Sequence, residues 1–198
     1  MEVRLNLSME NAAPQGSYSR QAMLPILRRI SCVLLLCLLA VAPLRARRAP
    51  DPSLKSLDGQ SRKLSTLRGK IVVVNFWATW CAPCQEELPR LAQIAQSYAG
   101  KSVEFVLISI DQPKDRAKIP AVLDRLHVAQ QSWVGGDTDL MDRFGLGDIV
   151  PGTAVLDERG EVVARIMGEA REDDVRRAVD WLLAGKTGPA APELTKRY

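Results

Sequence analysis

Residues 71–97 read IVVVNFWATWCAPCQEELPRLAQIAQS, and this stretch decides the fold. Its first seven residues are an apolar, β-branched run with the length of a buried strand. The apolar residues that follow return at helical spacing, and Gly100 provides a stop signal. The stretch therefore predicts a strand that leads directly into a helix, with Cys81 and Cys84 at the junction.

The same alternation continues along the chain. Apolar periodicity and turn residues predict strand 103–110, helix 114–127, helix 139–144, strand 154–156, strand 162–167 and helix 171–184. The last two strands flank a turn and form a hairpin, so the sheet that begins parallel ends antiparallel. Earlier in the chain, Asp58 and Gly59 provide a turn between two short extended pieces. The predicted fold class is α/β, a central mixed sheet flanked by helices with an N-terminal β extension.

Residues 1–48 predict a targeting segment. The apolar run Ile30–Leu44 follows Arg28 and Arg29, which is the order of a signal peptide. About 15 helical residues cover roughly 22 Å, less than the roughly 30 Å hydrocarbon core of a bilayer. A cleaved signal peptide is therefore favoured, and a retained membrane anchor remains the alternative. Because the stretch before the apolar run is long, we expect translation to begin at Met23.

The folded domain is expected over residues 49–185. Residues 186–198 contain proline, glycine and charged side chains without periodicity, which predicts an unstructured C-terminal tail.

The net charge of +4 comes from the N-terminal segment. Residues 1–48 hold seven arginines and two glutamates, which leaves 20 basic and 21 acidic side chains in the rest of the chain. A nearly neutral domain has no electrostatic footprint for a nucleic-acid backbone. Nucleic-acid binding is therefore excluded as a function class.

Cys81 and Cys84 are placed for reversible disulfide chemistry. Cysteines three residues apart on one helical turn face the same side and can bond with little backbone movement. Cys81 lies at the helix N-terminus, where free N–H groups and the helix dipole favour a thiolate, so it is the expected attacking residue. Cys84 lies one turn further in and suits the resolving role. Pro83 fits the first turn, where no N–H is needed.

Other uses of the two cysteines have less support. A structural zinc site needs two more ligands, and His127 is the only histidine in the chain. Haem attachment requires histidine directly after the second cysteine, where the chain has Gln85. A purely structural disulfide within one helical turn would constrain almost no loop. No metal ligands are therefore assigned.

Two segments carry a family resemblance. Residues 69–89, GKIVVVNFWATWCAPCQEELP, and residues 150–157, VPGTAVLD, resemble the TlpA/ResA-like branch of the thioredoxin superfamily. The resemblance spans roughly residues 51–184 and implies a thioredoxin-like fold. It also implies that Pro151 follows a cis peptide bond, packs beside the disulfide and belongs to the catalytic site. The expected substrate-binding positions are Trp80, Ala82, Pro83 and Val150.

Glu87 occupies the position at which the family has a carboxylate behind the active site. Because it follows Cys84 by one helical turn, it lies on the cysteine face of the helix. A partly buried carboxyl group with a raised pKa can exchange protons with a thiol. We expect Glu87 to act in this way and the neighbouring Glu86 to be solvated.

The predicted function is an extracytoplasmic thiol–disulfide oxidoreductase, in the bacterial periplasm or at the outer face of the inner membrane. The resemblance implies that it reduces substrate disulfides without a cofactor. It also implies electrons from a membrane thiol–disulfide donor, and clients in cytochrome c maturation or copper-site assembly. Two alternatives remain open: a disulfide oxidase or isomerase, and a copper metallochaperone that binds metal through Cys81 and Cys84.

Overall fold

The computed structural model describes residues 48–198. The predicted signal peptide or anchor and the proposed start at Met23 lie outside these residues. Within the described part of the chain, no helix combines the length and apolar character needed to cross a bilayer.

The described residues form strands, α-helices and two short 3-10 helices. In chain order they are β1 (Leu54–Ser56), β2 (Ser61–Arg62), η1 (Leu64–Leu67), β3 (Ile71–Trp77), α2 (Ala82–Ser97), β4 (Val103–Ser109), η2 (Arg116–Lys118), α3 (Ile119–Arg125), β5 (Gln131–Val134), α4 (Thr138–Arg143), β6 (Gly152–Leu156), β7 (Val162–Gly168), α5 (Glu172–Leu183) and β8 (Leu194–Arg197).

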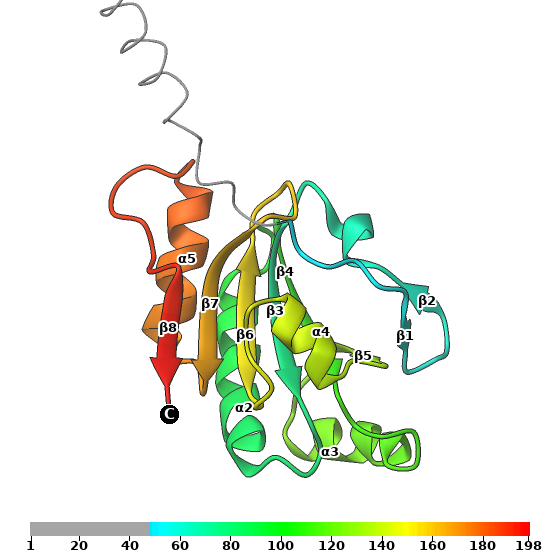
Figure 1. Ribbon diagram of the computed structural model, residues 1–198. Helices are drawn as coiled ribbons and strands as arrows, with labels where there is room; N and C mark the ends of the chain where they lie inside the picture. Colours follow the sequence, from blue (N-terminus) through cyan, green and yellow to red (C-terminus); the bar gives the residue numbers. More distant parts are fainter. Residues whose placement is uncertain (1–47) are drawn as a thin grey trace, which may run out of the picture. The chain divides into compact units, whose positions relative to one another are not determined.

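All the strands join one mixed sheet with the order β2-β1-β5-β4-β3-β6-β7-β8 (Figure 1). The central strand β3 runs parallel to β4 and antiparallel to β6, and β6 pairs antiparallel with β7. The hairpin β1–β2 extends the sheet beyond β5. The predicted α/β class, mixed sheet and N-terminal β extension are confirmed.

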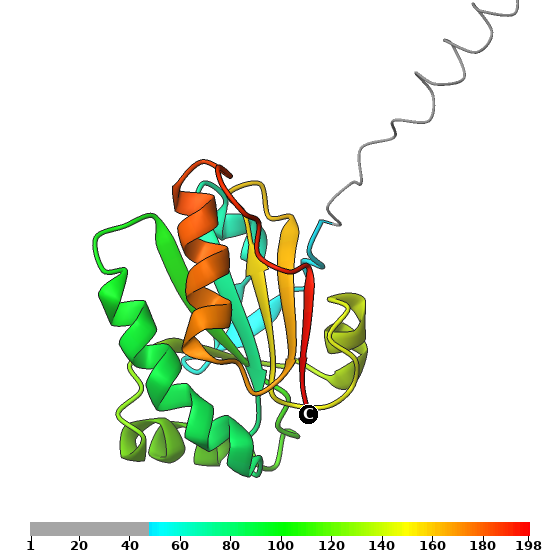
Figure 2. The ribbon, with the colours of Figure 1, turned by 90° about the vertical axis from the view of Figure 1, so that its left-hand side faces the viewer.

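Different helices cover the two faces of the sheet. Figure 2 shows α2 and α5 on one face and α4 on the other. The side chains of β3 alternate between these layers: Val72, Val74 and Phe76 pack in the apolar cluster that includes α4, whereas Ile71 and Val73 pack with α2 and α5. Since β3 is buried along its whole length, any polar side chain on it needs a partner inside the protein.

The region after β4 differs from the sequence-based prediction. The single helix expected over residues 114–127 is divided into η2 and the shorter helix α3. Pro120 explains the division, because a residue without an N–H fits only the first turn of a helix. Strand β5, which was not predicted, follows α3 and pairs parallel with β4.

The prediction of an unstructured tail over residues 186–198 is wrong. Leu194–Arg197 form β8, which pairs in parallel with β7 and becomes the edge strand of the sheet. The sheet therefore ends with a parallel pair after the predicted antiparallel hairpin. Thr195 and Arg197 are half-buried and alternate with exposed Leu194 and Lys196. A four-residue strand of mixed polarity gives no clear periodic signal, because it is defined by its pairing with a distant segment.

Candidate active site

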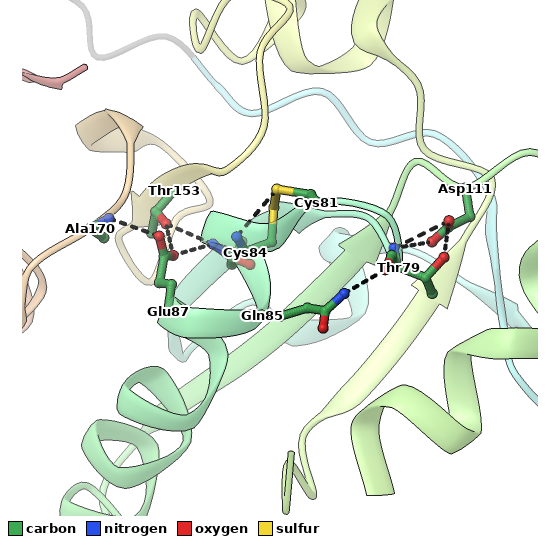
Figure 3. The surroundings of a disulfide bond; sticks show 9 residues. Thr79, Cys81, Cys84, Gln85, Glu87, Asp111, Thr153 and Ala170 are labelled. Carbon is green, nitrogen blue, oxygen red and sulfur yellow. Dashed lines mark hydrogen bonds between the residues drawn. A yellow bond between two sulfur atoms is a disulfide. The ribbon is translucent and has the colours of Figure 1, made fainter. Parts of the chain in front are cut away.

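Cys81 and Cys84 form a disulfide at the N-terminus of α2 (Figure 3). Their Cα atoms are 5.3 Å apart, and Cys81 is the N-cap residue of the helix. The Cys84 N–H donates to Cys81 Sγ at 3.2 Å, so one free N–H of the first turn faces the sulfur that would carry a thiolate charge. Cys81 is 5% exposed and Cys84 1%, which leaves Cys81 as the more accessible sulfur.

Glu87 lies one turn further along α2 and is completely buried. Its Oε1 accepts a hydrogen bond from Asn75 Nδ2 at 2.7 Å, and its Oε2 accepts one from the Ala170 N–H at 2.8 Å. The Thr153 hydroxyl lies 3.5 Å from Oε1 and accepts a hydrogen bond from Asn75 Nδ2. Four separate segments of the chain therefore meet at this carboxyl group: α2, β3, β6 and the β7–α5 connection.

Burial raises the pKa of Glu87 to about 8. The Ala170 N–H stabilises the carboxylate and opposes this rise, while the negative charge of Glu169 adds to it. The positive charge of the Arg90 guanidinium, which is paired with Glu169, acts against the rise. Among the described residues, no cation forms an ion pair with Glu87, so burial dominates and the neutral acid is favoured.

The turn that precedes Cys81 is tied to a second buried carboxylate. Asp111 follows β4, and its oxygens accept hydrogen bonds from the Thr79 N–H at 3.0 and 3.2 Å and from Thr79 Oγ1 at 2.6 Å. Ser109 Oγ donates to the same carboxylate at 2.8 Å. Gln85 of α2 donates to the Thr79 carbonyl at 2.6 Å. These contacts fix the backbone that delivers Cys81 to the helix N-terminus.

The Val150–Pro151 peptide bond is cis, as the family resemblance predicts. Val150 packs against the apolar cluster that contains both cysteines. The Pro151 carbonyl accepts a hydrogen bond from the Gly168 N–H at 3.0 Å, which ties this segment to the end of β7.

A groove of about 370 Å³ lies next to this segment. It is lined by Trp80, Ile110, Gln112, Asp137, Thr138, Asp148, Ile149 and Val150. Trp80 is 64% exposed and Ile149 61% exposed, so two large apolar side chains face solvent in the same groove. The groove thus combines an apolar surface with two carboxylates.

The sequence profile of one family matches residues 46–165, which include the disulfide, Glu87 and Pro151. The chain belongs to the AhpC/TSA family. Relatives with similar sequences include the thiol-disulfide oxidoreductase ResA of Geobacillus kaustophilus, which is 30% identical over 132 residues, 67% of this chain and 74% of the relative. The thioredoxin-like protein YneN of Bacillus subtilis is 28% identical over 139 residues, 68% of this chain and 78% of that protein.

Solved structures of thiol–disulfide proteins share the fold of this AhpC/TSA family member. The thiol:disulfide interchange protein of Chlorobium tepidum superposes with a TM-score of 0.61 at 28% identity, over 72% of this chain and 99% of that chain. MTB dsbF superposes with a TM-score of 0.58 at 29% identity, over 68% of this chain and 98% of that chain. With its disulfide at a helix N-terminus, the protein is a thioredoxin-like thiol–disulfide oxidoreductase of the ResA type.

The structure brings most of the predicted site residues together. Glu87, which was expected to be partly buried, is completely buried, and Glu86 is exposed as predicted. Trp80 and Val150 line the groove, whereas Ala82 and Pro83 are exposed at the start of α2 and do not line it.

Sequence reasoning did not identify the partners of the carboxylates. Asn75 was detectable in principle, because it is the only polar residue in the apolar run of β3. Asp111 lies two residues after the end of β4, at the same end of the sheet as Cys81, a common place for site residues in α/β proteins. The sequence indicates Thr153 only weakly as a partner of Glu87. It does not indicate the Ala170 N–H at all, because every residue except proline has a backbone N–H.

The described residues contain no group of three or more His, Cys, Asp or Glu side chains arranged to hold a metal ion.

Proposed function

We propose that this oxidoreductase reduces disulfides of protein clients outside the cytoplasm. One observation carries the proposal: the helix N-terminal Cys81–Cys84 pair is followed, one turn later, by a buried carboxyl group with a raised pKa. This arrangement supplies an attacking sulfur, a resolving sulfur and a proton acceptor on one helix.

The exchange proceeds in two steps. In the reduced protein, the Cys81 thiolate attacks one sulfur of the client disulfide, forms a mixed disulfide and releases the other client sulfur as a thiol after it takes up a proton. Cys84 then loses its proton and attacks Cys81 Sγ. The second client thiol leaves, and the Cys81–Cys84 disulfide forms. The two cysteines lose two electrons, and the client gains them. The client thiols also take up two protons, and at least one of these comes from solvent, because Cys81 attacks as a thiolate and carries no proton.

Glu87 is the proposed acceptor of the Cys84 proton. An unperturbed thiol has a pKa of about 8.5, and the pKa of Glu87 is raised to about 8. Proton transfer between groups with similar pKa values costs little free energy in either direction. The ionised fraction of Glu87, which grows as the pH rises toward 8, can therefore take the proton when Cys84 attacks, and the neutral acid can return a proton when the disulfide is reduced.

The groove beside Val150 is the proposed client surface. Trp80 and Ile149 can bind the apolar side chains that flank a client cysteine, and an extended client segment can pair with the backbone near Pro151. Asp148 and Asp137 line the same groove and would favour clients with basic residues near the cysteine.

The proposed location is the bacterial periplasm or the outer face of the inner membrane. It is supported by the apolar run Ile30–Leu44 behind two arginines. In that compartment a reductant needs a continuous supply of electrons, so we propose a membrane thiol–disulfide donor. Apocytochrome c and copper-site assembly proteins are the proposed clients.

Trapping of mixed disulfides tests the proposal. The reduced Cys84→Ser variant cannot resolve, so it should accumulate a covalent complex with insulin or with a cytochrome c peptide that carries a disulfide. The Cys81→Ser variant should form none, because the attacking sulfur is absent. Equal trapping by both variants would contradict the assigned order.

A redox titration tests the direction of exchange. Proteins with this fold have potentials from about −270 to about −120 mV. A value near the negative end supports reduction of clients. A value near −120 mV would instead indicate an oxidase or isomerase.

A further inference from the structure

The short connection between β7 and α5, residues 168–171, contacts two residues of the site. The Gly168 N–H donates to the Pro151 carbonyl at 3.0 Å, and the Ala170 N–H donates to Glu87 Oε2 at 2.8 Å. Ala170 is buried, and its N–H is the only backbone donor to this carboxyl group among the described residues. Its position therefore affects how well the charged form of Glu87 is stabilised.

The other side of this connection is held by the C-terminal strand. Gly168 pairs with Arg197 of β8 so closely that a Cβ at Gly168 would lie 2.8 Å from the Arg197 carbonyl oxygen. Arg197 also makes two hydrogen bonds to the buried Asp174 carboxylate, from Nε at 3.0 Å and from Nη2 at 2.6 Å. Asp174 in turn accepts the Arg171 N–H at 3.2 Å.

The chain of contacts from β8 to the site is continuous. It runs from Arg197 to Asp174 and Arg171, which is next to Ala170, and from Ala170 to Glu87. An arginine–carboxylate pair with two hydrogen bonds fixes orientation as well as distance. We propose that Arg197 is a positioning residue: through Asp174 and residues 168–171, it holds the Ala170 N–H against the Glu87 carboxyl group.

This inference concerns a part of the chain that lies beyond the family match, which ends at residue 165. The effect of Arg197 on disulfide exchange rests on the proposed role of Glu87 in proton transfer. The structural claim, that Arg197 controls the Ala170–Glu87 hydrogen bond, stands on the contacts alone.

Other groups around Glu87 set the background for the test. Glu169 and Arg90 are the charged groups that affect its pKa, and they are paired with each other on the protein surface. Asn75 from β3 and Thr153 from β6 are uncharged. The Cys84 thiol titrates only after reduction, so the oxidised protein isolates the carboxyl group.

The test is a pH titration of oxidised, 13C-labelled protein by NMR, with the Glu87 signal assigned from Glu87→Gln. In Arg197→Ala, loss of the Ala170 donor should raise the pKa of Glu87 by about 0.5 or more. The Ala170 amide proton should follow the Glu87 titration in the wild type and lose this response in the variant. Lys196→Ala removes the same charge from the same strand without an ion pair, and it should leave both signals unchanged.

Three results would overturn the proposal. These are an unchanged pKa in Arg197→Ala, a lowered pKa that indicates entry of water, or the same shift in Lys196→Ala. If Arg197→Ala does not fold, Arg197→Lys provides the same test with a smaller rise, since lysine cannot make the paired hydrogen bonds.

The pH profile of client reduction separates this inference from the proposed function. If Glu87 handles the Cys84 proton, the midpoint of the profile in Arg197→Ala moves with the measured pKa. If the pKa moves and the profile does not, the positioning role is supported and the proton-transfer role of Glu87 is wrong.

Discussion

Two buried carboxylates lie on opposite sides of the Cys81–Cys84 disulfide, and the protein holds them in different ways (Figure 3). The Asp111 carboxylate accepts its hydrogen bonds from two residues, Thr79 in the turn before Cys81 and Ser109 at the end of β4. Glu87 accepts from Asn75 and from Ala170, which come from segments far apart in the chain.

The difference in hydrogen bonding and pKa supports separate roles for the two acidic side chains. Asp111 is fastened to the turn that leads to Cys81, so its contribution is to geometry. Glu87 also has three donors, but the Thr153 hydroxyl lies as far as 3.5 Å from the carboxyl group. Burial raises its pKa to about 8, so its proposed contribution is to proton exchange. Each role can be tested by substituting one carboxylate and measuring the stability or the pKa that depends on it.

The largest effect is expected for the pH dependence of stability in Glu87→Gln. Burial raises the folded-state pKa of Glu87 from 4.5 to about 8, so the folded protein keeps a proton that the unfolded chain releases. The stability linked to this proton is fully present below pH 4.5 and is lost as the pH rises through about 8. At about 1.36 kcal/mol per pKa unit, the loss is roughly 5 kcal/mol.

Urea unfolding of both oxidised proteins between pH 4 and pH 9 measures this loss. The wild-type free energy of unfolding should fall relative to that of Glu87→Gln across the interval. Parallel curves would show that Glu87 has an ordinary pKa.

A smaller effect is expected for Asp111→Asn. The new amide group would face the Thr79 donors and leave a buried N–H or O–H unpaired, at a cost of about 2 kcal/mol. Glu104→Gln is the control, because it changes a half-exposed carboxylate at the start of β4 that forms only a surface ion pair with Lys70. A stability within about 0.5 kcal/mol of the wild type would show that Asp111 does not anchor the turn.

Gln85→Ala removes the partly buried side-chain hydrogen bond to the Thr79 carbonyl and an exposed one that Gln85 accepts from Arg125. The loss should cost about 1 kcal/mol, because neither contact is fully buried. A loss of this size lowers Tm by about 2–4 °C in a domain of this length. Thermal unfolding measures it, with the exposed neighbour variant Glu86→Ala as control. Equal Tm values for the two variants would show that Gln85 does not stabilise the turn before Cys81.

The smallest effect is expected for Thr153→Val, which removes a hydroxyl 3.5 Å from Glu87 Oε1 without a change of shape. Loss of this weak donor should raise the pKa of Glu87 by about 0.3, measured by 13C NMR. Ser132→Ala is the control. It removes a buried hydroxyl that accepts a hydrogen bond from Trp77 Nε1, and it should leave the pKa of Glu87 unchanged. A fall in the pKa in Thr153→Val would assign the hydroxyl a different role.

Most of the architecture could be predicted from local patterns. The strand–helix junction, the hairpin and the closing helix have long periodic patterns. The spacing of their apolar residues therefore predicts which face is buried. The patterns failed for β5 and β8, which are short and mixed in polarity, and for the helix divided before Pro120. The two strands form because they pair with distant segments of the chain, and the helix is divided because Pro120 lacks an N–H. Neither cause is visible in the apolar periodicity.

By itself, the sequence determined the Cys81–Cys84 pair at a helix N-terminus and the turn that separates Glu87 from Cys84, because both follow from spacing along one helix. Only the tertiary structure decided what surrounds Glu87. The depth of burial that raises its pKa depends on β3, β6 and the β7–α5 connection, and the Ala170 donor lies 83 residues away in the chain. Solvation and hydrogen bonding are properties of assembled neighbours, and spacing along the chain does not record them.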